Sequence, residues 1–186
     1  MSNDRYTPPG LSKHRAGRSF CLAGLRALVL LLVFAGAATT FAQDRARIPS
    51  FDLEALDGSR FSSTSLAGKV ILVDFWATWC APCIQEIPHL NDLQARYRTQ
   101  GLVVVGVTVQ SGWASDVKPD VERFGIRYPV VLGDQNVEKG FGGVWGLPTT
   151  FLVDRKGRIH RKYAGQDPQK HVHLEAEIQK LLADTR

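Results

Sequence analysis

Two cysteines three residues apart, Cys80 and Cys83, separate an apolar run from a stretch with helical spacing. The run, residues 70–76, is apolar apart from Asp74, which is typical of a buried central strand. In residues 80–97 apolar side chains recur every three or four positions, which predicts a helix that begins at the cysteine pair. Two cysteines so placed share one face of the helix and can form a disulfide without movement of the backbone.

The start of the helix also predicts different roles for the two thiols. Cys80 meets the unpaired N–H groups and the positive end of the helix dipole, which stabilise a thiolate. Cys83 lies one turn further in, where we expect it to be shielded. We therefore predict that Cys80 is the nucleophile and that Cys83 resolves the mixed disulfide formed on Cys80.

A zinc site or a structural disulfide would use the same cysteines differently. Zinc needs two further ligands, but the third cysteine, Cys21, lies near the N-terminus. The histidines after the motif offer no pair with metal-finger spacing: His89, His160, His171 and His173. The last two do not share a helix face, and we expect them to form a solvated surface pair. A structural disulfide over so short a loop would add little stability. Redox catalysis is therefore favoured, with no bound metal and no cofactor.

The order of predicted elements indicates an α/β fold. Two buried strands, residues 70–76 and 102–109, flank the predicted helix, so we expect parallel pairing with a right-handed crossover. Pro88 should kink that helix. The other expected elements are a hairpin at 51–61 turning at Asp57-Gly58, a short helix at 116–125, strands at 129–132, 149–153 and 158–163, and a final helix starting at Asp167-Pro168.

The positive charge of the chain is concentrated at its N-terminus. Residues 1–42 hold five basic groups and one acid, which accounts for most of the formal charge of +5. Residues 27–43 carry no charge and end in small residues, which is typical of a secretory signal. We predict that residues 1–42 are removed as a signal peptide or stay as a membrane anchor attached through residues 27–42. Either outcome makes the remainder periplasmic or otherwise extracytoplasmic.

The rest of the chain is close to neutral. We interpret residues 43–48 as a linker and residues 49–186 as one folded domain. Because no basic face remains once the leader is set aside, nucleic acid is not expected as a partner.

Two separated segments carry a family resemblance. Residues 73–83 resemble the active-site segment of the thioredoxin superfamily, and residues 146–157 look like its second signature, the proline loop and hairpin. Residues 49–183 as a whole resemble the exported, TlpA/ResA-like branch of thiol–disulfide oxidoreductases. The resemblance implies a thioredoxin-like fold, with a central mixed β-sheet flanked by helices, an N-terminal hairpin and a central insertion at about residues 110–132.

The resemblance also implies roles for single residues. Pro148 matches the cis-proline beside the cysteine pair, and Leu147 would present its backbone to a substrate strand. Trp79 is expected to cap the cysteine pair and to contact substrate. Asp74 matches the buried aspartate of thioredoxins; an acid in an apolar strand should have a raised pKa and would accept the proton of Cys83.

Glu86 matches a glutamate of the TlpA/ResA-like branch, near the active site. Many members of that branch have asparagine at the position of Asp74, whereas this chain has both acids. Which of the two acids accepts the proton of Cys83 is therefore open. The alternative for Glu86 is a role at the protein surface.

The resemblance finally implies a function. We expect a protein-disulfide reductase that acts on exported proteins, with apocytochrome c as the leading substrate and copper-site proteins next, and hence a role in cytochrome c biogenesis. A reductant in an oxidising compartment also needs a membrane thiol-electron donor as partner. The alternatives are a disulfide oxidase or isomerase, and a thioredoxin-fold copper metallochaperone.

Overall fold

The computed structural model describes residues 45–184. The predicted leader and its cleavage site lie outside these residues. Within residues 45–184 no helix is long and apolar enough to cross a membrane. The end of the predicted linker pairs with the domain, because Ile48 donates a backbone hydrogen bond to Gly157 and Ala46 accepts one from Ile159.

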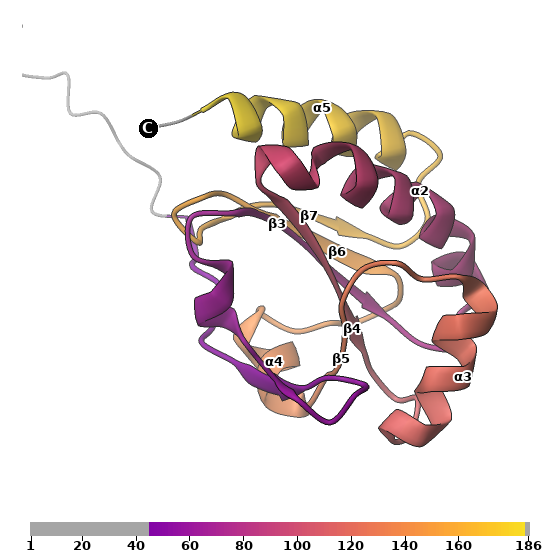
Figure 1. Ribbon diagram of the computed structural model, residues 1–186. Helices are drawn as coiled ribbons and strands as arrows, with labels where there is room; N and C mark the ends of the chain where they lie inside the picture. The colour runs from indigo at the N-terminus through magenta and orange to yellow at the C-terminus, as the bar shows by residue number, and fades with distance from the viewer. Residues whose placement is uncertain (1–44, 185–186) are drawn as a thin grey trace, which may run out of the picture. The chain divides into compact units, whose positions relative to one another are not determined.

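A mixed sheet of five strands lies at the centre of the domain (Figure 1). Its order is β5-β4-β3-β6-β7, from β3 (Val70–Trp76), β4 (Leu102–Thr108), β5 (Val130–Leu132), β6 (Thr149–Val153) and β7 (Ile159–Ala164). The first three strands run parallel, and β6 and β7 are antiparallel to their neighbours. The predicted parallel pairing of the two buried strands is confirmed, with Val70 opposite Leu102 and Trp76 opposite Thr108.

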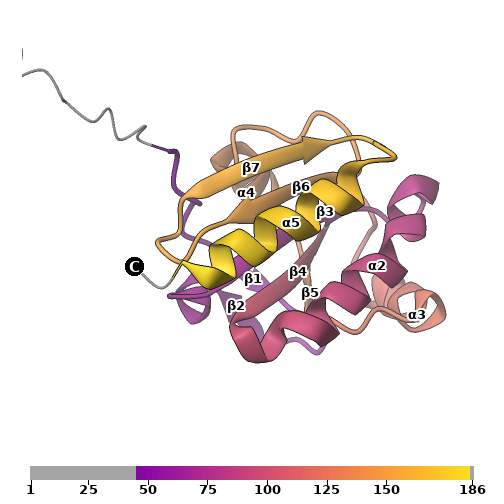
Figure 2. The same ribbon diagram turned by 90° about the horizontal axis from the view of Figure 1, so that it is seen from above.

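Three helices cover one face of the sheet. They are α2 (Ala81–Tyr97), α3 (Ala114–Phe124) and α5 (Lys170–Ala183). Leu90, Val117 and Leu174, one from each helix, belong to the same buried cluster as Leu72 and Val104 of the sheet. Seen from above, α5 lies beside α2 over the strands (Figure 2).

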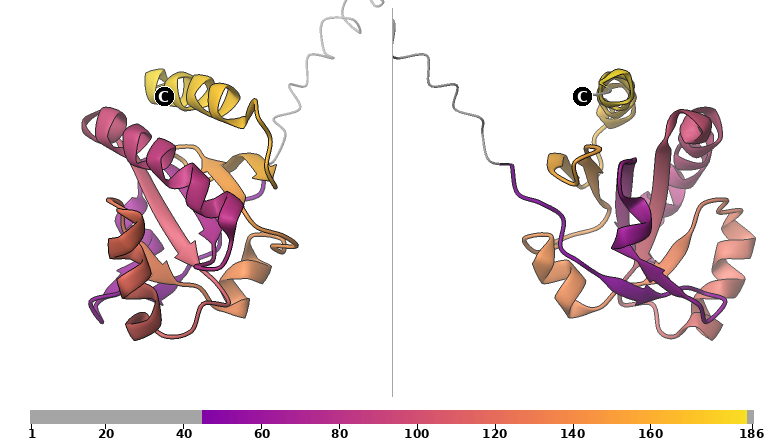
Figure 3. Two further views of the ribbon diagram at one scale, coloured as in Figure 1. Left: turned by 90° about the vertical axis from the view of Figure 1, so that its right-hand side faces the viewer. Right: turned by 60° about the vertical axis from the view of Figure 1, so that its left-hand side comes forward.

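The other face is covered by smaller elements. These are the hairpin of β1 (Asp52–Glu54) and β2 (Arg60–Ser62), the 3-10 helix η1 (Ser63–Leu66) and α4 (Gln135–Gly140). Their apolar side chains pack on Phe75 and Phe151 in a second buried cluster. Figure 3 shows this hairpin on the side away from α2 and α5. The remaining 3-10 helix, η2 (Arg98–Gln100), follows α2 directly.

Several boundaries differ from the expectations. The predicted hairpin is present, with Leu53 opposite Phe61 and Gly58 at a φ of 81° in its turn. The last helix begins at Lys170 and not at Asp167-Pro168, because the Asp167 carboxylate accepts the backbone N–H of Gln169 and closes a separate turn. The predicted insertion contains α3 and β5, and β5 becomes the edge strand of the sheet. Pro88 lies within α2, and the kink stays a prediction.

Candidate active site

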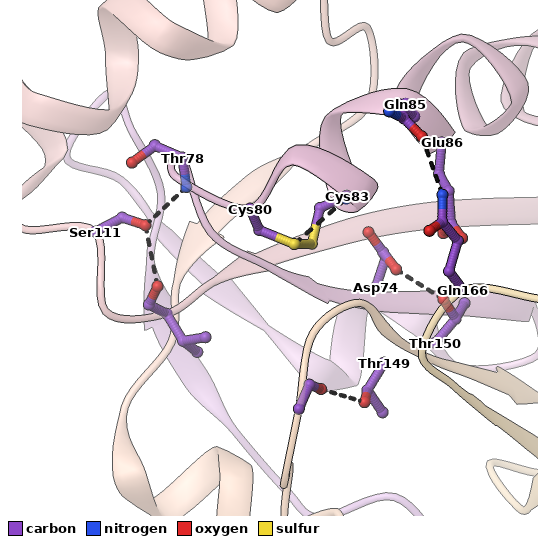
Figure 4. Close-up of a disulfide and its surroundings, with 12 residues drawn as sticks. Asp74, Thr78, Cys80, Cys83, Gln85, Glu86, Ser111, Thr149, Thr150 and Gln166 are labelled. Atoms are coloured by element: carbon purple, nitrogen blue, oxygen red, sulfur yellow. Dashed lines mark hydrogen bonds between the residues drawn. A yellow bond between two sulfur atoms is a disulfide. The ribbon is translucent and has the colours of Figure 1, made fainter.

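Cys80 and Cys83 form a disulfide at the N-terminus of α2 (Figure 4). Their Cα atoms are 5.3 Å apart. Cys80 caps the helix, and its Sγ accepts the backbone N–H of Cys83 at 3.3 Å. Both cysteines are buried, and Cys80 is the slightly more exposed residue, at 4% against 1% for Cys83. The Cys80 sulfur thus lies at the positive end of the helix dipole, where a thiolate is stabilised.

The loop that carries the cysteines is held by the loop after β4. Thr78 donates its backbone N–H to Ser111 Oγ at 3.0 Å, and the Trp79 indole donates to the Gln110 carbonyl at 2.9 Å. Gln110 adopts a left-handed φ of 52°, which is uncommon for a residue other than glycine. The Trp79 ring is 62% exposed, so it lies at the surface beside the cysteines and is available to a partner.

Asp74 is buried in β3 on the same side of the sheet as the disulfide. Side chains alternate along a strand, and its neighbours Leu72 and Trp76 share a buried cluster with both cysteines. Thr150 of β6 donates its hydroxyl to Asp74 Oδ1 at 2.7 Å. Burial raises the pKa of Asp74 to about 7, although the Lys170 charge and the Thr150 hydrogen bond oppose this shift. The acid can therefore give or take a proton near neutral pH.

A second buried acid lies one helical turn after Cys83. Glu86 is buried, and its Oε2 lies 2.6 Å from the ammonium group of Lys170. The alternative of a surface role for Glu86 is therefore wrong. Tyr128 is also buried here, and its pKa is raised well above the usual value by burial and by the charges of Asp74 and Glu86.

Lys170 was not anticipated from the sequence. Lysine is rarely buried without a partner, so its identity argues for the surface. The signal that places it inside is its spacing, because Lys170, Leu174 and Ile178 recur every four residues and all three are buried. Thr150 was not anticipated either, since its hydroxyl meets Asp74 only through the pairing of β3 with β6.

The proline loop lies beside the end of β3. The Leu147–Pro148 peptide bond is cis, as the resemblance implied. Thr149, the next residue, pairs with Phe75 near the end of β3, and its hydroxyl donates to the Gly146 carbonyl at 2.6 Å. The Pro148 carbonyl accepts the backbone N–H of Gly165. The loop is thus fixed at both sides, next to the strand that leads to Cys80.

Fold and site together define a thioredoxin-fold thiol–disulfide oxidoreductase. The chain belongs to the Redoxin family, whose model matches residues 43–182. It is 32% identical to the thiol-disulfide oxidoreductase ResA of Geobacillus thermodenitrificans, over 82% of this chain and 94% of that protein. It is also 30% identical to the thioredoxin-like protein YneN of Bacillus subtilis, over 73% of this chain and 80% of that protein.

Solved structures confirm the fold. A putative thiol:disulfide interchange protein DsbE from Chlorobium tepidum matches with a TM-score of 0.70 and 30% identity, over 75% of this chain and 97% of that one. A second thiol:disulfide interchange protein of the thioredoxin family from Chlorobium tepidum matches with a TM-score of 0.66 and 32% identity, over the same shares. The mixed sheet flanked by helices is thus that of thioredoxin-like proteins.

Proposed function

We propose that the protein works outside the cytoplasm as a reductase of disulfides in exported proteins, with apocytochrome c as the leading substrate class. The observation that carries the proposal is the Cys80–Cys83 disulfide at the start of α2, above the buried acid Asp74. The predicted leader, residues 1–42, supports export, and its apolar residues 27–42 would attach the protein to the inner membrane if it is retained.

The reaction begins with the dithiol form. The Cys80 thiolate attacks one sulfur of the substrate disulfide, forms a mixed disulfide with it and releases the other substrate sulfur as a thiolate. Cys83 then gives its proton to the Asp74 carboxylate and attacks Sγ of Cys80. The mixed disulfide breaks, and the second substrate sulfur leaves as a thiolate, which takes a proton. Two electrons have passed to the substrate, and the Cys80–Cys83 disulfide seen in the structure remains.

A membrane dithiol donor would return the protein to its reduced form. Its thiolate attacks Cys80, and Cys83 leaves as a thiolate that takes the proton held by Asp74. The second donor thiolate then displaces Cys80, so that the donor becomes a disulfide and the electron pair stays on the protein. The same acid therefore serves both half-reactions, once as a base and once as an acid.

Substrate would bind across the surface next to Cys80. The backbone of Leu147 would face this region from the proline loop, where the Leu147–Pro148 bond is cis and the Thr149 hydroxyl binds the Gly146 carbonyl. The exposed ring of Trp79 would offer the substrate an apolar surface beside the cysteines. An extended segment that carries a disulfide would lie between the two.

A trapping experiment tests the proposal. The full-length Cys83→Ser variant, produced in its own compartment, should accumulate mixed disulfides between Cys80 and exported proteins, because the resolving thiol is gone. Cys80→Ser is the matched control and should trap nothing. Absence of any mixed disulfide with Cys83→Ser would contradict the proposal.

The reduction potential of the pair tests the direction of electron flow. A value well below about −200 mV supports a reductase, whereas a value far above it would make the protein an oxidase or isomerase. Cytochrome-type partners among the trapped proteins would identify the substrate class.

A further inference from the structure

We propose that Lys170 is a positioning residue that decides which of the two buried acids carries the working proton. Its ammonium group holds Glu86 as a carboxylate and leaves Asp74 to exchange the proton of Cys83. The inference rests on the proposed function and assigns a proton path within it.

The Glu86–Lys170 pair is buried as a unit. Lys170 Nζ lies 2.6 Å from Glu86 Oε2, and the two side chains are 1% and 5% exposed. A charge in such a place is sustained only by a partner of opposite charge, because the loss of hydration is otherwise too large. The close contact therefore holds both groups in their charged forms.

Asp74 lacks an equivalent contact. Its Oδ1 accepts a hydrogen bond from the neutral Thr150 hydroxyl, and the charge of Lys170 reaches it without a direct hydrogen bond among the described residues. The groups that act on it are the cation Lys170, the anion Glu86 and the buried phenol of Tyr128. One buried cation thus serves two buried acids, and the acid outside the ion pair is the one that becomes neutral.

Three elements meet at this arrangement. Asp74 comes from β3, Glu86 from the second turn of α2 and Lys170 from the first residue of α5. Figures 2 and 4 show α5 beside α2, and Asp74 and Glu86 on the same side of the sheet as the disulfide. Because Glu86 lies three residues after Cys83, its ion pair is one helical turn from the resolving thiol. It can set the charge around Cys83 without itself exchanging a proton.

The proposal predicts that the pH at which Asp74 ionises shifts in opposite directions when Lys170 and Glu86 are replaced one at a time. In Lys170→Met the two acids lose their cation, so Asp74 ionises only at a higher pH. In Glu86→Gln the freed Lys170 ammonium favours the Asp74 carboxylate, and ionisation moves to a lower pH. The double variant, Lys170→Met with Glu86→Gln, removes both the cation and the anion that act on Asp74. Its shift therefore lies between those of the single variants, and no unpaired charge is left buried.

The Cys83 step can be timed without the natural substrate. The reduced full-length protein reacts with an aromatic disulfide whose released thiolate is coloured. Attack by Cys80 releases the first thiolate, and attack of Cys83 on the Cys80 adduct releases the second while the Cys80–Cys83 disulfide forms. The rate of the second release is recorded across pH in each variant, and the adduct of Cys83→Ser shows the first release alone.

We expect the inflection in the plot of the second-release rate against pH to move up by about one pH unit in Lys170→Met. In Glu86→Gln it should move down by a similar amount. Below the inflection, a one-unit rise means an approximately tenfold slower release. Lys170→Arg should restore the native inflection, and Lys180→Met, on the exposed side of α5, should leave it in place.

The infrared band of a buried protonated carboxyl gives a second measurement. Recorded at a pH below the inflections of both the native protein and Glu86→Gln, it should be absent in Asp74→Asn and present in Glu86→Gln. Loss of the pH dependence in Glu86→Gln would overturn the proposal, as would shifts of equal sign in the two single variants. If Lys170→Met does not fold, Glu86→Gln and the double variant still decide the outcome. A failed trap with Cys83→Ser would reject the physiological function and leave this measurement unaffected.

Discussion

His89 of α2 and His171 of α5 meet edge to face, with ring centroids 4.2 Å apart. His89 Nε2 and His171 Nδ1 are both buried, and neither has a hydrogen-bond partner among the described residues. His171 is therefore half-buried, and only His173 matches the expected solvated surface pair. The charged groups that act on His89 are His171, Glu175, Asp92 and Arg96, and burial with His171 lowers the pKa of His89.

The histidine contact predicts a loss of stability in acid. Because the pKa of His89 in the folded protein lies below 6.5, the unfolded chain binds more protons as the pH falls below that value, and the free energy of unfolding decreases. His89→Phe should make this decrease smaller, by at most about 1 kcal/mol since the ring is only partly buried and solvent screens its charge. Urea unfolding above and below pH 6.5 measures it, with His173→Gln as the control. An equal decrease in both variants would contradict the prediction.

The raised pKa of Asp74 predicts that the free energy of unfolding depends on pH in the opposite direction. Its pKa is about 7 in the folded protein and 3.8 in an unperturbed aspartate, so the folded protein holds the extra proton between these values. The free energy of unfolding from this group therefore falls as the pH rises through that window. Asp74→Asn should be more stable than the native protein above pH 7, by roughly 2–4 kcal/mol at most, and equally stable in acid. Asp52→Asn, at an exposed ion pair, should change stability by less than about 0.5 kcal/mol at any pH.

Two aromatic rings leave little room for a side chain at Gly106. It lies opposite Asp74 in β4, and a Cβ there would come within 3.1 Å of both Trp76 Nε1 and Tyr128 Cε2. Both rings are buried, so making room for a methyl group would disturb the packing around them, and Gly106→Ala should lower the free energy of unfolding by about 1–3 kcal/mol. Gly146→Ala, where a Cβ would meet no atom within 4 Å, is the control for chemical denaturation. Equal stability of Gly106→Ala and the native protein would show that the rings can repack.

A helix or strand can be predicted from the sequence where its apolar residues follow one spacing throughout. β3 is an apolar run apart from Asp74, β4 is one up to its final Thr108, and α2 keeps its apolar side chains on one face, so all three are predictable. α4 has six residues and a single buried side chain, Val137, which is too little for a period to be seen. It is therefore missed, although Asp134 is a good helix cap.

Some residues of the candidate site can likewise be predicted from the sequence, whereas others cannot. The cysteine pair is recognisable because its chemistry depends on neighbours in the sequence. The partners of its acids are not, because Thr150 and Lys170 reach Asp74 and Glu86 from 76 and 84 residues away in the sequence. Only the register of β3 with β6 and the docking of α5 bring them together.

Thr150 supplies the last prediction, through its 2.7 Å hydrogen bond to Asp74. A hydroxyl donor stabilises the carboxylate and lowers the pKa of Asp74, so removing it raises that pKa further. Thr150→Val keeps the shape of the side chain and should move the inflection of the Cys83 step up by about half a pH unit. Thr149→Val is the matched control, because its hydroxyl binds the Gly146 carbonyl. It should leave the inflection in place even if the proline loop loosens. Equal shifts in the two variants would mean that the hydrogen bond acts through the shape of the strand and not through the charge on Asp74.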